Sequence, residues 1–447
     1  MGAKNVQTAR FGIVHFGIGA FHRAHQAWYT DKAQDQKQDG AGWSIVGISL
    51  RSATVAQQLN PQDGLYTVTE CSPGGRAVRV IGSVRQVLTA SEQPEAVAAA
   101  IAAPETHIIT FTVTEKGYCR TAEGSLDPEL AQEGSIYPFL GRGLRRRLDA
   151  GLPGLTLLSC DNLAHNGRQL ENLLTAYLRK QDPELAEWTA RTCTFPCSMV
   201  DRIVPATTIA DLDAVAAAID MEDRGAVVTE PFSQWVIEDR FAGQRPAWER
   251  VGAELVADVT PYETAKLRLL NGAHSALAYL GLEQGHTFVH EAVADPAIRP
   301  VIEQLMRDEA APTIPAAPGQ DLGAYADALL HRFANPALNH RLIQIAMDGS
   351  QKITQRWLET LLESRNRCPA ILTALAAWLR HVRGDNTAIW GAVDDPMAEA
   401  LALAWKGRTS AEAVHAILGH DGVICGESAL RSSDAKELLA LIDAKRM

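Results

Sequence analysis

Four short apolar runs in the first 162 residues constrain the fold of this chain more than any other feature. Each run ends in polar or glycine residues, and they are "FGIVHFG" (11–17), "WSIVGISL" (43–50), "HIITFTVTE" (107–115) and "LTLLSCDN" (155–162). Near-continuous apolar runs of this length are typical of strands that are buried on both faces of a parallel sheet. Helix-like segments such as "SEQPEAVAAAIAAP" separate the runs. The alternation predicts an α/β fold with a doubly wound parallel sheet.

The strand signals fade after about residue 256, and the remainder of the chain has helical periodicity. The change falls near "VGAELVADVTPYE", where a last strand is followed by Pro261 at a helix start. Two alternating runs joined by a Pro-Gly-Gly turn, within residues 64–84, predict a β-hairpin inserted in the first part. We therefore predict a sheet domain over residues 1–257 and a mostly α-helical domain over residues 258–447.

The composition argues against several classes of protein. The 447 residues carry a formal net charge of −11, whereas nucleic-acid-binding proteins more often have a basic face. No apolar run reaches the roughly 18–20 residues of a membrane span, and "MGAKNVQTARFGIVHFG" passes directly into a strand rather than forming a signal peptide. Cysteines occur at positions 71, 119, 160, 193, 197, 368 and 425 without a framework spacing. Reduced cytoplasmic thiols are therefore expected, and the lone Cys193-x3-Cys197 pair is not expected to bind zinc.

The first strand is followed by Gly17-x-Gly19 and then by a helix. In dinucleotide-binding folds the first glycine permits a tight turn, and the second lets backbone N–H groups approach a pyrophosphate. The third glycine of the fingerprint is replaced by His22. The position of the pattern favours a dinucleotide site over a tight turn without a ligand. For His22, Arg23 and His25 we expect helix-surface or phosphate-side positions rather than metal binding, because no third ligand is evident nearby.

The end of the second strand commonly supplies a carboxylate that binds the ribose 2′-hydroxyl of NAD. Here "GISLRSATVAQQ" offers Arg51, Ser52, Ala53 and Thr54 and no acid. Arg51 is suited to a 2′-phosphate instead. These residues leave the choice between NAD and NADP open.

The stretch "YETAKLRLLNGAHSALAYLG" (262–281) places Glu263, Lys266, Asn271 and His274 among apolar helical positions. At about 100° per residue, these four side chains fall within one arc of roughly 140° over three turns. One helix face thus presents an acid, an amine, an amide and an imidazole. A solvated face with a Lys–Glu pair is the alternative interpretation. Periodicity alone does not decide between the two.

Polar residues also follow the ends of the predicted strands, where open parallel sheets bind their ligands. They are Lys116 in "TVTEKGY", Asp161 and Asn162 in "LLSCDNLAHNG", and Asp201 and Arg202 in "FPCSMVDRIVP". A lysine that is buried enough to have a lowered pKa can exchange a hydroxyl proton, and Glu263 beside it can relay the proton to water. The amides of Asn162 and Asn271 can hold an oxygen that gains charge during hydride transfer. This chemistry needs no metal.

These motifs resemble those of the long-chain polyol and sugar-acid dehydrogenases, a family that includes mannitol 2-dehydrogenase and fructuronate reductase. The resemblance runs nearly end to end, through "VHFGIGAFHRAHQAWYTD", "TVTEKGYC", "FPCSMVDRIVPATT" and the K-x4-N-x2-H pattern of Lys266, Asn271 and His274. It implies a Rossmann-type N-terminal domain that binds NAD and a mostly α-helical C-terminal domain. It also implies metal-independent hydride transfer in the cleft between the two domains.

The resemblance further implies roles for single residues. Lys266 is the general acid/base, Asn162 and Asn271 stabilise the oxyanion, Asp201 and His274 bind substrate, and Glu263 is the proton gate. The residues expected on the cofactor side are Gly17, Gly19, Ala20, Phe21, Arg51, Thr114 and Asn162. The further residues expected on the substrate side are Lys116, His340, Arg341 and Gln344.

Two positions favour the sugar-acid branch of the family. Gln344 stands where mannitol-type members have a substrate-binding arginine, and Lys116 adds a cation that suits a substrate carboxylate. We therefore predict an NAD-dependent oxidoreductase, with NADP not excluded, that interconverts D-mannonate and D-fructuronate. We expect a cytoplasmic monomer without metal, nucleic-acid or membrane partners. The alternatives are a polyol 2-dehydrogenase for mannitol or arabinitol, a non-catalytic nucleotide-sensing protein and a zinc-dependent alcohol dehydrogenase.

Overall fold

The computed structural model describes residues 10–35, 42–121, 123–384, 387–424 and 430–444. The chain divides into two units, Met1–Thr260 and Pro261–Met447, and each is considered by itself. Cys425 and the N-terminal residues 1–9 lie outside the described ranges. The cysteines within these ranges are all buried. No helix within them is long and apolar enough to cross a membrane.

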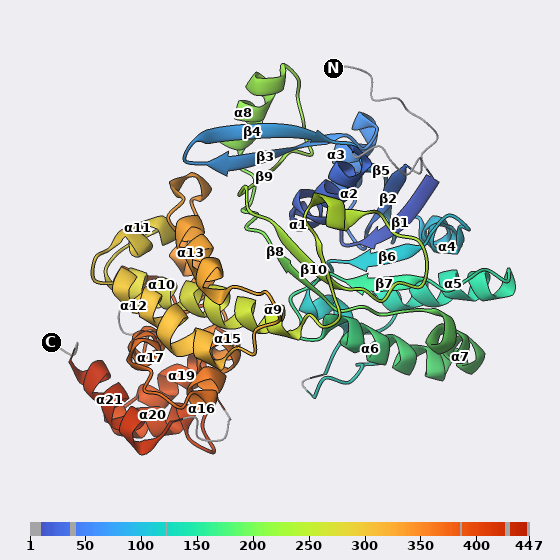
Figure 1. The fold of residues 1–447 in the computed structure, drawn as a ribbon. Helices are drawn as coiled ribbons and strands as arrows, with labels where there is room; N and C mark the ends of the chain where they lie inside the picture. Colours follow the sequence, from blue (N-terminus) through green and yellow to red (C-terminus); the bar gives the residue numbers. More distant parts are fainter. Residues whose placement is uncertain (1–9, 36–41, 122, 385–386, 425–429, 445–447) are drawn as a thin grey trace. The chain divides into compact units, whose positions relative to one another are not determined.

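The first unit contains a five-stranded parallel sheet (Figure 1). Its strands are β1 (Arg10–Phe16), β2 (Trp43–Ser49), β5 (Val84–Thr89), β6 (Ile108–Phe111) and β7 (Thr156–Ser159), in the order β5-β2-β1-β6-β7. The chain runs outward from β1 to β5 and then returns to β6 on the other side of β1. The strand order therefore reverses between β1 and β6, and this switch point is where such sheets bind ligands. The four apolar runs are β1, β2, β6 and β7, so the predicted doubly wound sheet is confirmed.

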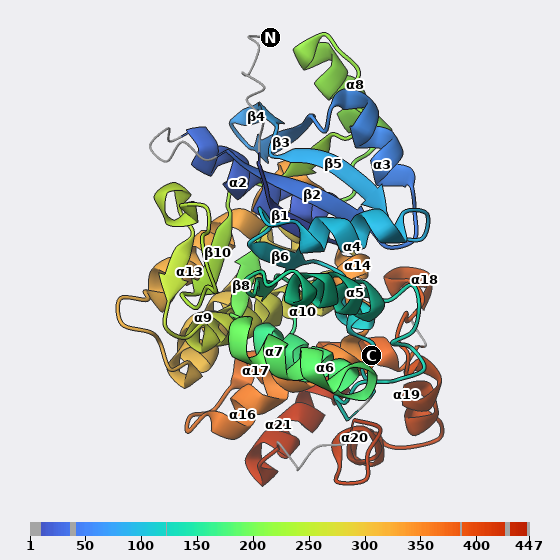
Figure 2. The ribbon, with the colours of Figure 1, turned by 90° about the vertical axis from the view of Figure 1, so that its right-hand side faces the viewer.

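Helices cover both faces of this sheet because successive strand residues point to opposite sides. Val14 and Phe16 belong to a core formed with α4 (Pro94–Ala102), α5 (Ile136–Asp149), α6 (Asn166–Gln181) and α7 (Pro183–Thr192). Figure 2 shows α4 and α5 in front of the strands. Ile13 belongs to a second core with α1 (Ala20–Ala24), α2 (Gln26–Asp35) and α3 (Thr54–Leu59).

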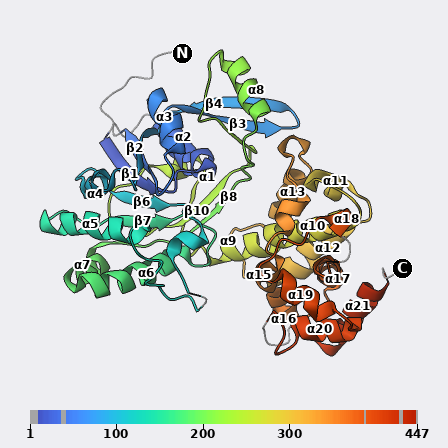
Figure 3. The same cartoon turned by 180° about the vertical axis from the view of Figure 1, so that it is seen from behind.

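Two small sheets complete the first unit. The predicted hairpin is present as β3 (Tyr66–Ser72) and β4 (Gly75–Ile81), and β9 (Val227–Thr229) pairs with β3 in parallel. Helix α8 (Ile209–Ile219) lies beside this hairpin (Figures 1 and 3), and its Asp211 pairs with Arg76 at 3.1 Å. The other sheet has the order β11-β10-β8 and consists of β8 (Ser198–Asp201), β10 (Gln234–Glu238) and β11 (Glu254–Val256).

The second unit is mostly helical, as predicted. Helix α10 (Gly272–Glu283) is buried from Gly272 to Leu282, and α11, α14 and α17 pack against it. The helices are α9 (Thr260–Ala265), α11 (Val289–Ala294), α12 (Arg299–Gln304), α13 (Leu322–Phe333), α14 (Leu342–Ala346), α15 (Gly349–Ile353), α16 (Glu359–Glu363), α17 (Pro369–Val382), α18 (Thr387–Trp390), α19 (Ala398–Trp405), α20 (Ser410–Leu418) and α21 (Ser432–Asp443). Short π-helices span Lys266–Asn271, Leu305–Ala310 and Thr354–Leu358. Short 3-10 helices span Asn60–Gln62, Glu115–Tyr118, Trp248–Val251, Ala311–Thr313 and Pro336–Leu338.

Candidate active site

The glycine turn after β1 is tight at Gly17 and open at Gly19. Gly17 has φ +94°, and a Cβ atom there would lie 2.1 Å from the carbonyl oxygen of Thr112, so only glycine fits. The Gly17 N–H donates to the Ile48 carbonyl at 2.9 Å, which ties the turn to β2. Gly19 is exposed, and the nearest atom to a Cβ there would be the Gly17 oxygen at 3.9 Å. The open backbone at Gly19 fits the close approach of a dinucleotide.

The residues that follow this turn enter the interior. Ala20 and Phe21 are partly exposed, whereas His22, Arg23 and His25 are buried. The predicted helix-surface positions of these last three residues are therefore wrong. Arg23 donates to the Gly225 carbonyl at 2.5 Å, and His25 is bonded through Nε2 to the Gln234 carbonyl at 2.9 Å.

His22 stacks on His15 with ring centroids 3.3 Å apart. The ring nitrogens of His15 bond the hydroxyls of Thr110 and Thr112 at 2.8 and 2.9 Å. Burial lowers the pKa of His15 to about 3 and holds the pKa of His22 well below its usual range. Both rings are therefore neutral near pH 7 and stack as flat, uncharged groups, with His22 at the position where a third glycine is expected.

The end of β2 carries no acid. Arg51 and Ser52 are exposed, and Ser49 donates its hydroxyl to the Ser52 carbonyl at 2.6 Å. The hydroxyls of Ser52 and Thr54 are bonded to each other at 2.7 Å. This hydroxyl-lined turn with Arg51 beside it leaves both NAD and NADP chemically acceptable.

The loop after β6 is held by Asp161, which follows β7. The Asp161 carboxylate accepts the N–H groups of Val113 and Thr114 at 3.0 and 2.9 Å and the Tyr118 hydroxyl at 2.8 Å. Thr114 has φ 64° and ψ 167°, a conformation that side-chain-bearing residues rarely adopt. Thr114 and Lys116 are both exposed on this loop.

Three of the residues predicted on the cofactor side thus gather at one edge of the sheet. The Thr112 hydroxyl donates to the Gly17 carbonyl at 2.8 Å, and Thr114 is bonded to Asp161, whose chain neighbour is the exposed Asn162. Gly17, Thr114 and Asn162 therefore follow adjacent strands β1, β6 and β7.

Asp201 and Arg202 lie at the end of β8 in the smaller sheet, and both are buried. Arg202 donates to Glu70 Oε1 at 2.6 Å and to the Glu230 carbonyl from Nε at 3.1 Å. Its guanidinium also lies over the Trp28 ring, 4.6 Å from the centroid. Arg202 is therefore fully engaged in holding the first unit together.

In the second unit, Glu263, Lys266, Asn271 and His274 lie on one continuous helical stretch, as the sequence predicts. The stretch is not uniformly α-helical, because Lys266–Asn271 is a π-helix in which Gly272 N–H donates to Leu267 O. A π-helix with bonds from i+5 to i rotates less per residue than an α-helix, so residues five apart lie closer together around its axis. Lys266 and Asn271 are five apart, so the arc between them is narrower than the α-helical wheel predicts. Both side chains are half-buried, which disfavours a fully solvated face.

His274 is buried at the start of α10 among aromatic rings. Its ring centroid lies 4.7 Å from that of Phe333 and 5.1 Å from that of His340, which meets it edge-on. Burial is the largest cause of a pKa held well below the usual histidine range, and His340, Arg332 and Arg356 lower it further. His274 Nε2 and His340 Nδ1 have no hydrogen-bond partner within the described residues. Each neutral ring therefore keeps one buried nitrogen that no described protein group binds.

Arg341 and Gln344 are exposed at the start of α14 and within it. The chain at His340 is anchored, since its carbonyl accepts the Val289 N–H at 3.0 Å. Of the three substrate-side residues predicted in this segment, His340 is the one whose ring contacts His274.

Two residues that sequence reasoning missed brace the π-helix. Arg356 donates to the Ser275 hydroxyl at 2.6 Å and to the Asn271 carbonyl at 3.3 Å. The buried Trp357 indole donates to the Gly272 carbonyl at 3.2 Å. Both come from the π-helix Thr354–Leu358, and their helical periodicity alone does not distinguish them from packing residues.

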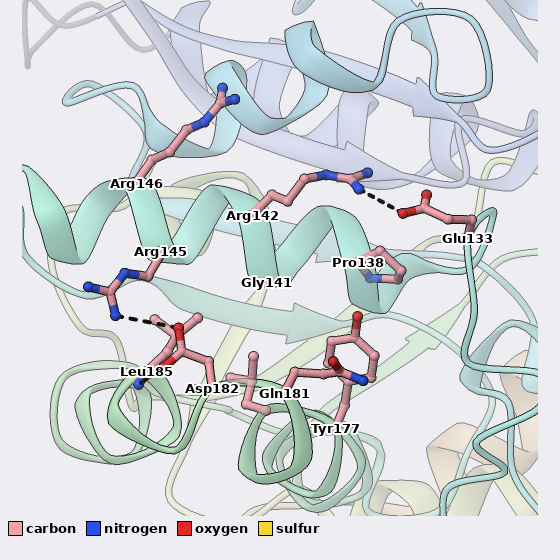
Figure 4. A pocket seen from close by; sticks show the side chains of 11 residues that line it. Glu133, Pro138, Gly141, Arg142, Arg145, Arg146, Tyr177, Gln181, Asp182 and Leu185 are labelled. Atoms are coloured by element: carbon pink, nitrogen blue, oxygen red, sulfur yellow. Dashed lines mark hydrogen bonds and ion pairs between the residues drawn. The ribbon is translucent and has the colours of Figure 1, made fainter.

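A surface groove of about 390 Å³ lies elsewhere in the first unit, and none of the predicted site residues lines it (Figure 4). Its arginines face acids, with Arg142 bonded to Glu133 at 2.8 Å and Arg145 paired with Asp182 at 3.4 Å. Within the described ranges, no group of three or more His, Cys, Asp or Glu side chains is arranged to hold a metal ion.

Known proteins match the chain over both units. The mannitol dehydrogenase Rossmann domain matches residues 11–250 and the mannitol dehydrogenase C-terminal domain matches residues 258–428. Mannitol 2-dehydrogenase of Phaeosphaeria nodorum is 41% identical over 433 residues, which cover 92% of this chain and 76% of that protein. D-mannonate oxidoreductase of Escherichia coli is 39% identical over 435 residues, which cover 93% of this chain and 89% of that protein.

A solved structure gives the same result. Pseudomonas fluorescens mannitol 2-dehydrogenase, in a ternary complex with NAD and D-mannitol, matches with a TM-score of 0.81 and 33% identity. The match covers 98% of this chain and 91% of that chain. The chain therefore belongs to the mannitol dehydrogenase family and is an oxidoreductase of the dehydrogenase class.

Proposed function

We propose that this protein interconverts D-mannonate and D-fructuronate with a nicotinamide cofactor, NAD or NADP. The observation that carries the reaction type is the helical stretch Thr260–Glu283, which presents an acid, an amine, an amide and a neutral imidazole within a family of dehydrogenases. In this proposal the first unit binds the dinucleotide at the glycine turn. The second unit supplies the proton-transfer residues.

Gly17 and Gly19 would hold a dinucleotide, which would serve as the acceptor of the hydride from the substrate C5 carbon when D-mannonate is oxidised. Lys266 takes the proton from the C5 hydroxyl, and Glu263 passes it to water. The amides of Asn162 and Asn271 donate to the oxygen while it carries negative charge. Asp201 and the neutral His274 bind the neighbouring hydroxyls. Oxidation of one alcohol thus yields one ketone, one reduced nicotinamide and one proton.

Lys116 and Gln344 support the sugar-acid substrate. Lys116 is exposed on the loop after β6, where its ammonium group is available to a substrate carboxylate. Gln344 replaces an arginine that the resemblance implies in mannitol-type members. The similarity to D-mannonate oxidoreductase agrees with this choice.

A polyol 2-dehydrogenase is the second candidate function, because the similarity to mannitol 2-dehydrogenases is equally high. The test is oxidation of NADH and of NADPH in the presence of D-fructuronate, D-tagaturonate, D-fructose or D-xylulose. The loss of absorbance of the reduced nicotinamide gives the rate. Turnover of a uronate far above the ketoses supports the proposal. Faster turnover of fructose or xylulose favours the polyol function and contradicts the role of Gln344.

Lys116→Gly tests the carboxylate contact separately. We expect KM for D-fructuronate to rise about tenfold or more, because a charge-assisted hydrogen bond is lost. Turnover of any neutral ketose should change little. An unchanged KM for the uronate would show that Lys116 does not bind the carboxylate. We also propose a monomer, which size-exclusion chromatography with light scattering tests directly.

A further inference from the structure

Asp161 is a buried carboxylate that the proposed reaction does not use. It is 9% exposed and lies directly after β7, beside the loop that follows β6. Three donors from that loop bind its carboxylate: the N–H groups of Val113 and Thr114, and the hydroxyl of Tyr118. Two successive backbone N–H groups that point at one carboxylate form a compact anion-holding arrangement.

The loop that Asp161 holds is strained at Thr114. Its φ of 64° with ψ of 167° lies in a region that glycine occupies almost alone. A β-branched residue stays there only when the surrounding structure imposes the conformation. The loop is also tightly packed, because a Cβ atom at Gly117 would lie 2.7 Å from the Cβ of Val113.

The support beneath the carboxylate is rigid. The buried Tyr118 hydroxyl is bonded to the Ser159 hydroxyl at 2.6 Å, and the Tyr118 carbonyl accepts the Tyr137 hydroxyl at 2.7 Å. Asn166 donates to the Asp161 carbonyl at 3.0 Å and fixes its backbone. Strands β6 and β7 are direct neighbours, with Phe111 opposite Ser159. The two loops that leave these strands are therefore joined through one side chain.

We propose that Asp161 is a positioning residue for the cofactor, whose ionised carboxylate keeps Thr114 and the loop after β6 in the conformation that binds the dinucleotide at the switch point. The inference rests on the proposed dinucleotide function of the first unit. It adds a residue that touches neither cofactor nor substrate but controls the affinity for the cofactor.

The carboxylate titrates in an accessible range. Burial raises the pKa of Asp161 to about 6 and outweighs the three hydrogen bonds, which act in the opposite direction. Among its neighbours, Glu115 raises this pKa further, while burial keeps Tyr118 and Cys160 protonated by raising their pKa values. Protonation of Asp161 removes the charge that the two N–H groups bind. Cofactor affinity should therefore fall as the pH falls through about 6.

The bonds from the Asp161 carboxylate to the N–H groups of Val113 and Thr114 are called the clamp below. Asp161→Asn tests the clamp, because one amide NH2 then faces a backbone N–H donor. We expect NAD+ to bind roughly tenfold more weakly or worse. Thr114→Gly supplies the matched rescue, since glycine adopts the strained conformation without cost. Thr114→Gly should restore most of the affinity in the Asp161→Asn protein, although it weakens the affinity of the wild type. Simple additivity of the two substitutions would overturn the proposal.

Two measurements distinguish a local effect on the loop after β6 from general unfolding of the variant. Amide hydrogen exchange of Val113 and Thr114 in the cofactor-free protein should accelerate in Asp161→Asn, whereas Tyr118→Phe, which keeps both N–H bonds, should cause a smaller change. Calorimetric titration of the wild type with NAD+ from pH 8 to pH 5 needs no variant, and its affinity should fall near pH 6. Unchanged exchange in Asp161→Asn, or a pH-independent affinity, overturns the inference. A wild type that binds neither NAD+ nor NADP+ at any pH instead overturns the proposed function, while accelerated exchange still shows that the clamp exists.

Discussion

At the scale of single residues, Lys266 is the group on which the proposed chemistry depends. It lies at the first position of the π-helix and is half-buried, with the amide-bearing Asn271 one π-turn away. An amine exchanges a proton with a substrate oxygen only when it lies within hydrogen-bond reach of that oxygen, directly or through one water. Its removal should therefore damage proton transfer rather than cofactor binding.

Lys266→Ala should lower kcat by several orders of magnitude, roughly 10³-fold or more, with little change in NAD+ affinity. Lys180 is an exposed lysine at the end of α6. Lys180→Ala is therefore the control, and it should leave kcat and NAD+ affinity unchanged. Steady-state kinetics and calorimetric titration measure the two effects. A Lys266→Ala protein with nearly full activity, or a wild type without any turnover, would favour the nucleotide-sensing alternative.

Gly17 and Gly75 both have positive φ but differ in the space around them. A Cβ atom at Gly17 would lie 2.1 Å from a backbone oxygen, whereas nothing lies within 4 Å of a Cβ atom at Gly75. Gly17→Ala should lower the free energy of unfolding by roughly 2–5 kcal/mol, since it adds a clash to the φ strain. Gly75→Ala should cost only about 1–2 kcal/mol. Urea denaturation measures the free energy of unfolding of both variants. Equal losses of this free energy would show that the turn at Gly17 adjusts to the new methyl group without cost.

At the scale of elements, the sequence predicts those features that repeat with a regular period. The apolar runs identify β1, β2, β6 and β7, and the helical periodicity of residues 262–281 identifies the helix that carries Lys266 and His274. The π-helix was not predictable, because a change from i+4 to i+5 bonding has no residue pattern of its own. The strands β8, β9 and β10 have three to five residues each, and their pairing depends on distant partners. Strand β11 is the last strand that the sequence predicts before Pro261. The stack of His22 on His15 is likewise a tertiary contact, so the sequence suggests a surface position for a buried ring.

The brace on the π-helix gives a prediction at this scale. Arg356→Ala removes the donor to the Ser275 hydroxyl and to the Asn271 carbonyl, so the turn that orients Asn271 should loosen. We expect kcat to fall roughly 10–100-fold. Ser275→Ala removes only one of these bonds and should have a smaller effect. Steady-state kinetics of both variants measure the difference in kcat, and circular dichroism confirms that they fold. An Arg356→Ala protein with wild-type kcat would show that the π-helix keeps its conformation without Arg356.

At the scale of the whole molecule, both units bury histidines that stay neutral. Burial lowers the pKa of His15 to about 3 and of His381 to about 4, and holds His22 and His274 well below the usual range. In the unfolded chain each of them takes up a proton near pH 6.5. Below that pH the unfolded state binds more protons than the folded state, so the free energy of unfolding must decrease as the pH falls.

Each such histidine contributes about 1.4 kcal/mol of lost stability per pH unit between pH 6.5 and its own folded pKa. Asp161 acts in the opposite direction between about pH 6 and pH 4, because its folded pKa is raised to about 6, and it offsets roughly one histidine. Asp161 does not offset the loss of stability that the other three histidines cause. The midpoint temperature of thermal unfolding should therefore fall steeply from pH 6.5 to pH 4. His22→Phe keeps a flat ring against His15 but cannot be protonated. In this variant the slope of the free energy of unfolding against pH should decrease by the contribution of about one proton. A slope that is unaltered in His22→Phe would mean that His22 is already protonated within the folded stack.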